Sequence, residues 1–457
     1  MANLPDHPTC DQLRAFVAES NLQYATIAFV DFQGTVRGKY VARANLETLF
    51  EQVSLPLTAL AFDPTDAILF APGIADLHSS FSDKPAKLLP ETARLIPWER
   101  EGRNLFLLAE FTGEGANYCP RSVYHRVAQR AEALGCLPYH AVEFEFTLFD
   151  ETPTSIVEKG YRHLKPASPS RAYFSLLRQG AQSELYNQLM DMCASMRIPV
   201  SSLHEEMGGG FMETSLRHSR GIEAADQAAL FRTFAKIVAH RNGMSITFMA
   251  RWSNDAHGQG GHVHFSLHDR AGKALFYDAG APNSVSKTML LAIGGMQHLM
   301  GDFLLMFAPN LNSYKRLVPG NFAPVSTAWG IENRTCAIRA IPGTPDSVRV
   351  EFRVPGADAN PYLSLAAVLA AALYGIEHET EPSEPFSGNA YESNAPAAIP
   401  LPVSLGEAIS RFRRSAEARE FFGDAFVSAY ADTRATQLAQ FNSLVSDREL
   451  ERFFEQV

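Results

Sequence analysis

The chain of 457 residues is longer than the roughly 250 to 300 residues that one hydrophobic core usually holds, so we expect two structural units. Hydrophobic residues make up 46% of it and charged residues 20%, a balance that excludes a disordered chain. The formal net charge is -10, and no dense block of Lys or Arg provides the basic surface that a nucleic acid requires.

The ends and the cysteines of the chain also limit its class. The stretch MANLPDHPTCDQLRAF has no basic region followed by an apolar segment, and the longest apolar run, LSLAAVLAAALYGI, is too short to span a bilayer. The five cysteines lack any C-x-x-C pair; they are Cys10, Cys119, Cys136, Cys193 and Cys336. We therefore expect a soluble, cytoplasmic protein with reduced cysteines and no membrane partner.

In the first part of the chain, short apolar runs such as YATIAFVDF and NLFLLAEF alternate with the turn clusters DFQG and TGEG. This pattern predicts a small sheet with a few helices. The break at TGEGANYCPRS then leads into a helix with Pro120 in its first turn and Gly135 at its end. We place the domain boundary there, with a first domain at 1–117 and a second at 118–457.

The second domain begins with the strand pattern AVEFEFTLFD, in which apolar side chains alternate with Glu143, Glu145 and Thr147. Two carboxylates on one strand face repel each other unless solvent, a shared proton or a cation relieves the repulsion. A divalent metal ion would turn this cost into a binding site. The alternative is an ordinary solvated strand face.

Three later segments repeat this pattern of charged residues. LHEEMGGGFMETS places Glu205 and Glu213 on either side of a glycine turn. GHVHFSL places His262, His264 and Ser266 on one strand face, and SVRVEFRV does the same with Arg349, Glu351 and Arg353. Between these strands run helical segments such as DQAALFRTFAKIVAHRNG, and a Pro- and Ser-rich loop, ETEPSEPFSGNAYESNAPAAIPLP, precedes the C-terminal helices.

A set of mostly carboxylate ligands with one imidazole favours Mg²⁺ or Mn²⁺ over Zn²⁺ or Cu²⁺. Arginines beside such ions suggest that anionic groups are bound as well. Metal ions and arginines facing one cavity are what phosphoryl transfer from a nucleotide requires. Taken singly, the histidines could be packed strand residues, and Arg349, Glu351 and Arg353 could form a surface ion-pair ladder.

Seven segments, in their order and spacing, resemble the glutamine synthetase family over nearly the whole chain: VRGKY, VEFEFTLF, HEEMGGGFMETS, GGHVHFSL, NSYKRLVPGNFAPV, ENRTCAIR and RVEFRVPGADANPYL. The resemblance implies an α+β fold, with an N-terminal β-grasp domain followed by a catalytic domain built on a curved antiparallel sheet with helices. It also implies homo-oligomeric rings of six subunits, single or stacked in pairs, with each active site between neighbouring subunits.

The resemblance further implies roles for single residues. One metal ion would be held by Glu145, Glu205 and Glu213, and a second by Glu143, His262 and Glu351. Glutamate would be bound by Gly258, Arg316 and Arg353, the transferring phosphoryl group by Arg334, and ATP by Ser266, Arg339 and Arg349. The implied reaction is an ATP-dependent carbon-nitrogen ligation in which the γ-carboxylate of L-glutamate becomes γ-glutamyl phosphate and an amine then displaces phosphate.

Two departures from the family pattern concern the amine. In GNFAP, Phe322 replaces a glutamate that helps to bind and deprotonate ammonium, and a phenyl ring can do neither. The ammonium-binding loop that reads Asp-Gly-Ser-Ser in the family is shortened to FDPTD, where Asp63 is the first candidate for the amine-site base and Asp66 the second. We therefore expect an amine larger than ammonia, as in the γ-glutamylamide synthetase branch. Phe322, together with Phe211 in place of a usual glutamine, favours apolar or aromatic monoamines.

Other readings stay open. A γ-glutamylpolyamine synthetase acting on putrescine or spermidine is the nearest alternative, followed by an ammonia-using glutamine synthetase and a non-catalytic scaffold relative. A guanidino-kinase-like enzyme is disfavoured by the match of the first domain. Smaller departures are His257 where the family has asparagine, Asp346 where it has a lysine near ATP, and the unmatched surroundings of Tyr391 in the region of the adenylylation site.

Overall fold

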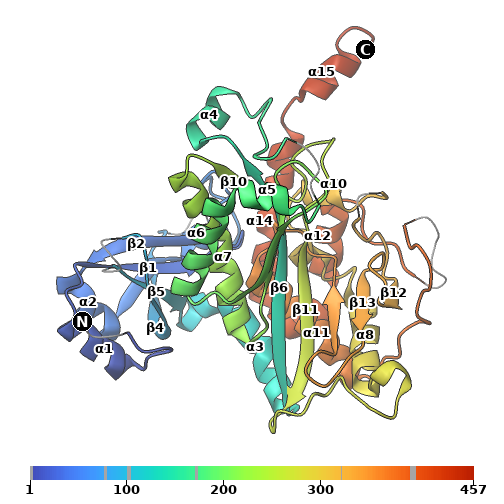
Figure 1. Ribbon diagram of the computed structural model, residues 1–457, viewed down its shortest axis with the longest axis horizontal. Coiled ribbons are helices and arrows are strands. Elements are labelled where there is room, and N and C mark those ends of the chain that lie inside the picture. The colour runs from blue at the N-terminus through green and yellow to red at the C-terminus, as the bar shows by residue number, and fades with distance from the viewer. Residues whose placement is uncertain (1–3, 77–79, 100–103, 170–172, 321, 392–397) are drawn as a thin grey trace.

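A computed structural model describes residues 4–76, 80–99, 104–169, 173–320, 322–391 and 398–457. Two sheets organise these residues, and they lie side by side with helices between and around them (Figure 1). The first sheet lies at the left of the view and the second at its centre and right.

The first sheet has five strands in the order β2-β1-β5-β4-β3. β5 is buried along its whole length, and β1 pairs with it in parallel while the other neighbours are antiparallel. The elements of this part are α1 Cys10–Glu19, β1 Tyr24–Val30, β2 Val36–Ala42, α2 Leu46–Glu51, β3 Val53–Pro56, β4 Asp83–Leu95 and β5 Asn104–Phe111. The predicted small sheet with a few helices is therefore present.

The break predicted at residue 117 falls at the end of a short 3₁₀ turn, Gly113–Asn117, just before helix α3, Pro120–Ala133. A continuous hydrophobic core nevertheless crosses it, because Trp98 and Phe106 of the first part both contact the ring of Phe234 in helix α7, Ile222–Arg241. The division into two domains stays a prediction.

The second sheet has the order β12-β13-β14-β11-β6-β8-β7, and β9 and β10 also pair with β6. Only β12 and β13 run parallel to each other; the remaining pairs are antiparallel. Its strands are β6 Cys136–Phe149, β7 Val200–Glu205, β8 Phe211–Leu216, β9 Ser219–Arg220, β10 Ser245–Thr247, β11 Gly261–Asp269, β12 Trp329–Ile331, β13 Ile338–Ile341 and β14 Arg349–Phe352. The long strand β6 is thus the centre of the sheet.

Helices cover the apolar face of this sheet. Phe144 and Phe146 of β6 are buried there, and the ring of Phe144 stacks on Phe231 of α7 at 5.9 Å. Helix α11 packs against α3, α7 and α8, so the apolar run LSLAAVLAAALYGI is a buried core helix. Among the described helices, none combines the length and the apolar character that crossing a membrane requires.

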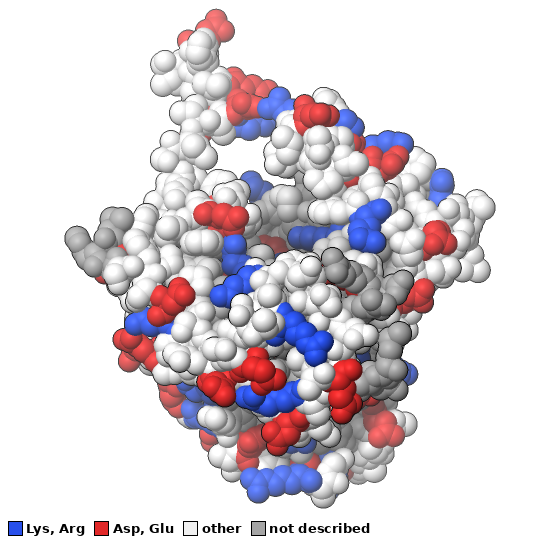
Figure 2. All heavy atoms as spheres, turned by 90° about the vertical axis from the view of Figure 1, so that its left-hand side faces the viewer, with Lys and Arg blue, Asp and Glu red and all other residues white. Residues whose placement is uncertain are grey.

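The helices of the second part are α3 Pro120–Ala133, α4 Pro153–Glu158, α5 Leu176–Ala181, α6 Ser183–Ser195, α7 Ile222–Arg241, α8 Lys287–Leu299, α9 Leu304–Phe307, α10 Ser313–Arg316, α11 Pro361–Glu377, α12 Leu405–Arg414, α13 Ala416–Phe422, α14 Asp424–Asn442 and α15 Asp447–Phe453. The last of them, α15, projects from the body of the molecule (Figure 1). On the face that carries the first sheet, acidic and basic side chains are interspersed (Figure 2).

Candidate active site

The register of the second sheet brings its charged side chains onto one face. His262 of β11 lies opposite Glu143 of β6, Glu145 of β6 opposite Glu213 of β8, and His264 of β11 opposite Glu351 of β14. Directly opposed residues of antiparallel strands share a face, so these side chains form one polar surface on the side away from the apolar core.

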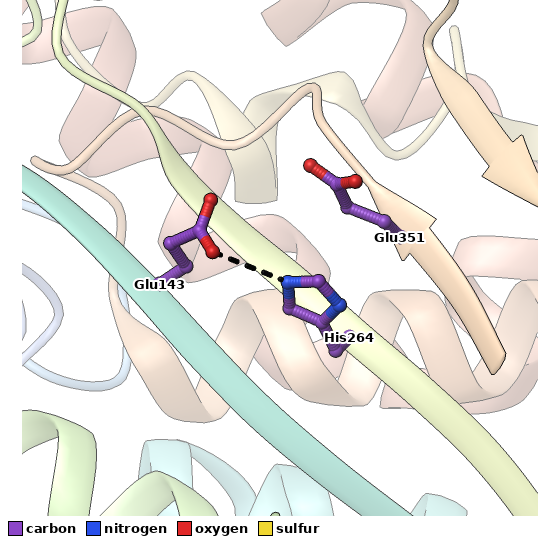
Figure 3. Close-up of side chains that lie close together, drawn as sticks. All are labelled: Glu143, His264 and Glu351. Atoms are coloured by element: carbon purple, nitrogen blue, oxygen red, sulfur yellow. Dashed lines mark ion pairs between the residues drawn. The ribbon is translucent and has the colours of Figure 1, made fainter. Parts of the chain in front are cut away.

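One group on this surface consists of Glu143, His264 and Glu351, which come from three adjacent strands and turn toward one another (Figure 3). His264 Nε2 lies 3.6 Å from Glu143 Oε2. The buried His262 joins the group, with its Nδ1 at 3.0 Å from Glu143 Oε1 and 3.6 Å from Glu351 Oε1. Two carboxylates and two imidazoles therefore converge.

Ionisation of the two carboxylates is favoured by hydrogen bonds from neighbouring histidines and by Arg353. Burial alone would raise the pKa of Glu143, but hydrogen bonds with His262 and His264 outweigh it and hold that pKa well below its usual range. Burial opposes ionisation of Glu351 as well, yet Arg353 and the two histidines lower its pKa to about 2. Both carboxylates are charged at neutral pH and can act as ligands.

The second group consists of His204, Glu206 and Glu213. His204 Nε2 lies 3.2 Å from Glu206 Oε1 and 3.6 Å from Glu213 Oε1. Burial, and then the nearby carboxylates of Glu143, Glu145 and other glutamates, raise the pKa of Glu213 to about 9. Burial and the neighbouring negative charges both disfavour the ionised form of Glu213.

The structure does not bring Glu205 to this group, and Glu206 and His204 lie there instead. An extra residue in β7 shifts its register between Val200 and Ser202, so that His204 faces Glu213 and Glu205 faces Met212. Without this bulge, Glu205 would share the face of Glu213, as the ligand set implied by the family resemblance requires. Glu205 is instead 1% exposed, and burial raises its pKa.

These two groups fit divalent cations. Within each, one ligand atom from every residue lies within 4.8 Å of the others. The carboxylate-rich donor set suits Mg²⁺ or Mn²⁺, and the raised pKa of Glu213 is a cost that a bound cation would remove. Glu145 is predicted to bind the same ion as Glu213. Its carboxylate accepts a hydrogen bond from the backbone N–H of Gly260.

The three residues predicted to bind glutamate lie together beside Glu145. Arg316 is 2% exposed and donates to the carbonyls of Val354 and Arg353 at 2.8 and 3.0 Å. Gly258 passes so close that a Cβ at this position would lie 2.6 Å from Arg316 Cγ. Arg353 forms an ion pair with Glu351. Two buried guanidinium groups thus flank the carboxylates that are predicted to bind metal, as binding of an anion requires.

The residues predicted to meet ATP lie on the β13-β14 side of the sheet. Arg339 Nη1 donates to Glu351 Oε2 at 3.0 Å, and Arg349 Nε donates to His264 Nδ1 at 3.2 Å. Ser266 lies two residues beyond His264 along β11, opposite Tyr139. Arg334 is exposed in the turn after β12, and its carbonyl accepts a hydrogen bond from the Tyr391 hydroxyl at 3.3 Å.

Phe322 is 55% exposed and stands between two other rings. Its centroid lies 5.8 Å from His257 and 5.9 Å from Tyr391, both in edge-on contact. Its φ of 52° is a left-handed conformation that is unusual for a phenylalanine. The residue that replaces the family's glutamate is therefore part of an aromatic row, and Tyr391 and His257 belong to it.

Asp63 and Asp66 lie in a turn of the first part of the chain. The Asp63 carboxylate accepts hydrogen bonds from the backbone of Thr65 and Ala67 at 2.7 and 2.9 Å, and from the Thr65 hydroxyl at 2.8 Å. Asp66 pairs with Arg37 at 2.6 Å. Neither aspartate hydrogen-bonds, among the described residues, to the metal-ligating strands of the same chain.

Sequence reasoning missed His204 and Glu206 as members of the site, and it left His264 without a role. The tripeptide His204-Glu205-Glu206 contained the signal, because either glutamate can face Glu213 depending on one bulge. Nothing in the local sequence reveals which one does.

Comparisons with known proteins agree with this geometry. The family model of the glutamine synthetase catalytic domain matches residues 117–453. A glutamate–isopropylamine ligase of Pseudomonas is 32% identical over 97% of both chains, and a γ-glutamylethanolamide synthetase of Streptomyces coelicolor is 33% identical over 98% of this chain and 96% of its own. A γ-glutamylputrescine synthetase of Escherichia coli is 29% identical over 94% and 91%.

A solved structure, a GmaS/ADP complex, superposes with a TM-score of 0.83 at 25% identity, covering 97% of this chain and 99% of that one. The fold expected from the resemblance, an α+β catalytic domain with a largely antiparallel sheet, is confirmed. A family match over most of the length, together with relatives above 30% identity, establishes that this chain is a member of the glutamine synthetase family.

Proposed function

We propose that this protein joins the γ-carboxylate of L-glutamate to an amine larger than ammonia, using ATP and passing through γ-glutamyl phosphate. The observation that supports the proposal most is the single polar sheet face, which carries two carboxylate and histidine groups and also arginines: Arg339 and Arg353 both contact Glu351, and Arg349 contacts His264. Such a face can neutralise the charge of a transferring phosphoryl group from several directions.

The residues divide between the two parts of the reaction. Glu145, Glu206, Glu213 and His204 would hold one Mg²⁺ or Mn²⁺, and Glu143, His262, His264 and Glu351 a second. Bound metal supplies charge neutralisation at the phosphates and at the γ-carboxylate. Gly258, Arg316 and Arg353 would orient glutamate, while Ser266, Arg339 and Arg349 would bind ATP and Arg334 the γ-phosphoryl group.

The amine is proposed to be apolar or aromatic rather than a polyamine. Phe322, His257 and Tyr391 offer ring surfaces and no carboxylate for a distal ammonium. The names of the relatives include isopropylamine, ethanolamide and putrescine, so the family context allows each class.

Asp63 is proposed as the amine-site base, acting in the site of a neighbouring subunit in a ring of six. Its carboxylate holds the turn through hydrogen bonds from Thr65 and Ala67, and among the described residues it makes no hydrogen bond to the strands that carry the proposed metal ligands. An assembly of identical rings, single or stacked, would bring the two together. All five cysteines are free, which fits the reducing cytoplasm as the place of action.

Phosphate release from ATP tests the proposal, measured with glutamate and Mg²⁺ or Mn²⁺ and either ammonium, ethanolamine, putrescine, spermidine, isopropylamine or benzylamine. We expect kcat/KM for isopropylamine or benzylamine to exceed that for ammonium by a factor of about 100 or more, since an unfilled pocket forfeits the binding of several carbon atoms. Ammonium as the best substrate would identify a glutamine synthetase, and inactivity with every amine would favour a scaffold.

A further inference from the structure

Resting on the proposed ligase function, we propose that a separate pocket of about 160 Å³ receives the apolar substituent of the amine. Its apolar wall is formed by Met207, Phe211 and Trp252, and its polar rim by Thr147, Asp255 and His257. None of these residues is predicted as a ligand of metal or ATP, and His257 alone stands at a position where the family has a substrate-contacting asparagine.

The pocket begins two residues along strands β6 and β8 from the carboxylates that are proposed to bind metal. Glu145 lies opposite Glu213 in the β6-β8 pair, and Thr147 lies opposite Phe211 in the same pair. Two residues along a strand cover about 6.6 Å and return to the same face. Thr147 and Phe211 therefore continue the face on which the γ-carboxylate would be phosphorylated, at the distance of a short amine substituent.

Two further links join the pocket to the reacting groups. Met207 directly follows Glu206 in the chain. The side chain of His204 lies between Glu206 and Glu213, with its Nε2 3.2 Å from Glu206 Oε1 and 3.6 Å from Glu213 Oε1. At the opposite rim, His257 directly precedes Gly258 and contacts Phe322 ring to ring at 5.8 Å. The pocket and the aromatic row thus meet at His257, and both border the place where the amine nitrogen would approach.

The composition of the wall decides between possible occupants. No Lys or Arg is among the described residues that line the pocket, so the α-carboxylate of glutamate would find no cation there. A neutral apolar group needs none. A distal ammonium would have Asp255, but this side chain is exposed, and pairing with an exposed carboxylate contributes little.

The volume is matched to a small ring or a branched alkyl group. A cavity of about 150 Å³ lined by apolar side chains accommodates benzene. The pocket of about 160 Å³ here therefore fits the substituent of benzylamine or of isopropylamine, whereas the chain of a polyamine would have to leave it. The predicted substrate class is a primary amine with an apolar group of this size.

The test uses a matched pair of methionines. Met207 lines the pocket and is 40% exposed, and Met190 on α6 is 41% exposed and lies away from the pocket wall. In the full-length enzyme we expect Met207→Ala to lower kcat/KM for benzylamine about fivefold or more, because apolar contact with the substrate is lost. The values for methylamine and for hydroxylamine, which do not reach the pocket, should change less than twofold, and Met190→Ala should change none of them.

Because Met207 is next to Glu206, Met207→Ala could also disturb the proposed metal ligand, so a second variant is needed on another segment of the pocket wall. Trp252→Leu should likewise lower kcat/KM for benzylamine and leave the formation of γ-glutamyl hydroxamate from hydroxylamine unchanged. An equal loss with all nucleophiles in both variants would overturn the pocket assignment. So would a preference for putrescine that Asp255→Asn abolishes, since the occupant would then be a cation.

Failure of the ligase function itself would look different. In that case the wild-type enzyme would form no hydroxamate and release no phosphate with any amine, and the pocket assignment would fall with it. Turnover by the wild type that is insensitive to amine size, in contrast, would leave the ligase function standing and reject the pocket alone.

Discussion

Glu213 lies among the carboxylates of four other glutamates, and burial together with these neighbours raises its pKa to about 9. In the metal-free folded protein it therefore stays protonated at neutral pH, while in the unfolded chain its pKa returns to the ordinary 4.5. The folded state binds the extra proton between these two values. Its contribution to stability is complete below about pH 4.5 and is lost as the pH rises toward 9.

Glu213→Gln removes this titration. With metal stripped by a chelator, we expect the variant and the wild type to have similar thermal midpoints near pH 5, and the variant to be more stable at pH 9 by about 1 kcal/mol or more. Thermal unfolding at pH 5, 7 and 9 measures the difference. Added Mn²⁺ should raise the midpoint of the wild type and much less that of the variant, and a difference independent of pH would contradict the assignment.

Glu205 and Glu206 provide a matched pair for the metal site. Glu206→Gln replaces a carboxylate that faces Glu213, so we expect the apparent Kd for Mn²⁺ to rise about 10-fold to 100-fold. Glu205→Gln changes a buried carboxyl on the opposite face and should leave that Kd within a factor of about three. Calorimetric titration of the metal-free variants measures both, and the reverse order would restore Glu205 as the ligand.

Glu205 and Glu206 also show which side chains of the site could be placed on a strand face from the sequence and which could not. Strict alternation predicted the shared faces of Glu143, Glu145, His262 and Glu351, because β6, β11 and β14 run without an irregularity at these positions. The role of Glu205 came from the family resemblance alone; in β7 one inserted residue exchanges the two faces, and the ligand role of Glu205 stays a prediction. A bulge depends on the pairing with the neighbouring strand, which no local pattern encodes.

At the scale of elements, the turn between β7 and β8 positions both Glu206 and Phe211. Its last glycine, Gly210, has a φ of 61°, and a Cβ there would collide with the carbonyl of Leu148 in β6. We expect Gly210→Ala to destabilise the protein by about 1 to 3 kcal/mol, since the turn must either accept strain or move.

Because the shifted turn carries a metal ligand, Gly210→Ala should also weaken Mn²⁺ binding. Gly160→Ala is the control, as Gly160 has a φ of 56° but no atom within 4 Å of the position that a Cβ would occupy, so it bears the backbone strain without the collision. Thermal unfolding and metal titration of the two variants separate the effects. Equal loss of metal affinity in both would show that the turn does not position Glu206.

Elements were predictable where one signal dominated. Pro120 marked the start of α3. For the apolar run of 363–376 the sequence excluded only a membrane span, and the structure shows it as the largely buried part of α11. The shape of the pocket between the β7-β8 turn and the loop before β11 had no such signal, because it arises from segments about 45 residues apart that meet only in the folded chain.

At the scale of the whole molecule, two features of one chain point to a second copy. Among the described residues, the Asp63 carboxylate accepts hydrogen bonds only within its own turn, and α15 projects with Phe453 50% exposed and Phe454 83% exposed. Exposed aromatic side chains on a projecting element are typical of surfaces that contact another subunit. Both features fit an assembly in which each active site combines residues from two copies of the chain. Such an arrangement has no local signal in the sequence of one chain.

Subunit mixing tests this arrangement. Asp63→Asn keeps an oxygen for the Thr65 and Ala67 N–H groups, so the turn persists while the proposed base is lost, and Glu351→Gln removes a metal ligand on the catalytic sheet. Each variant alone should be nearly inactive. Mixed rings are then prepared by refolding or co-expressing equal amounts of both chains. If each site combines Asp63 of one subunit with Glu351 of its neighbour, these rings should regain about one quarter of the wild-type activity. In a head-to-tail ring of randomly mixed chains, an intact Asp63 meets an intact Glu351 in about one quarter of the sites. Activity that stays at the level of the separate variants, in rings shown to contain both chains, would mean that the site is built within one subunit and that Asp63 acts, if at all, on its own chain.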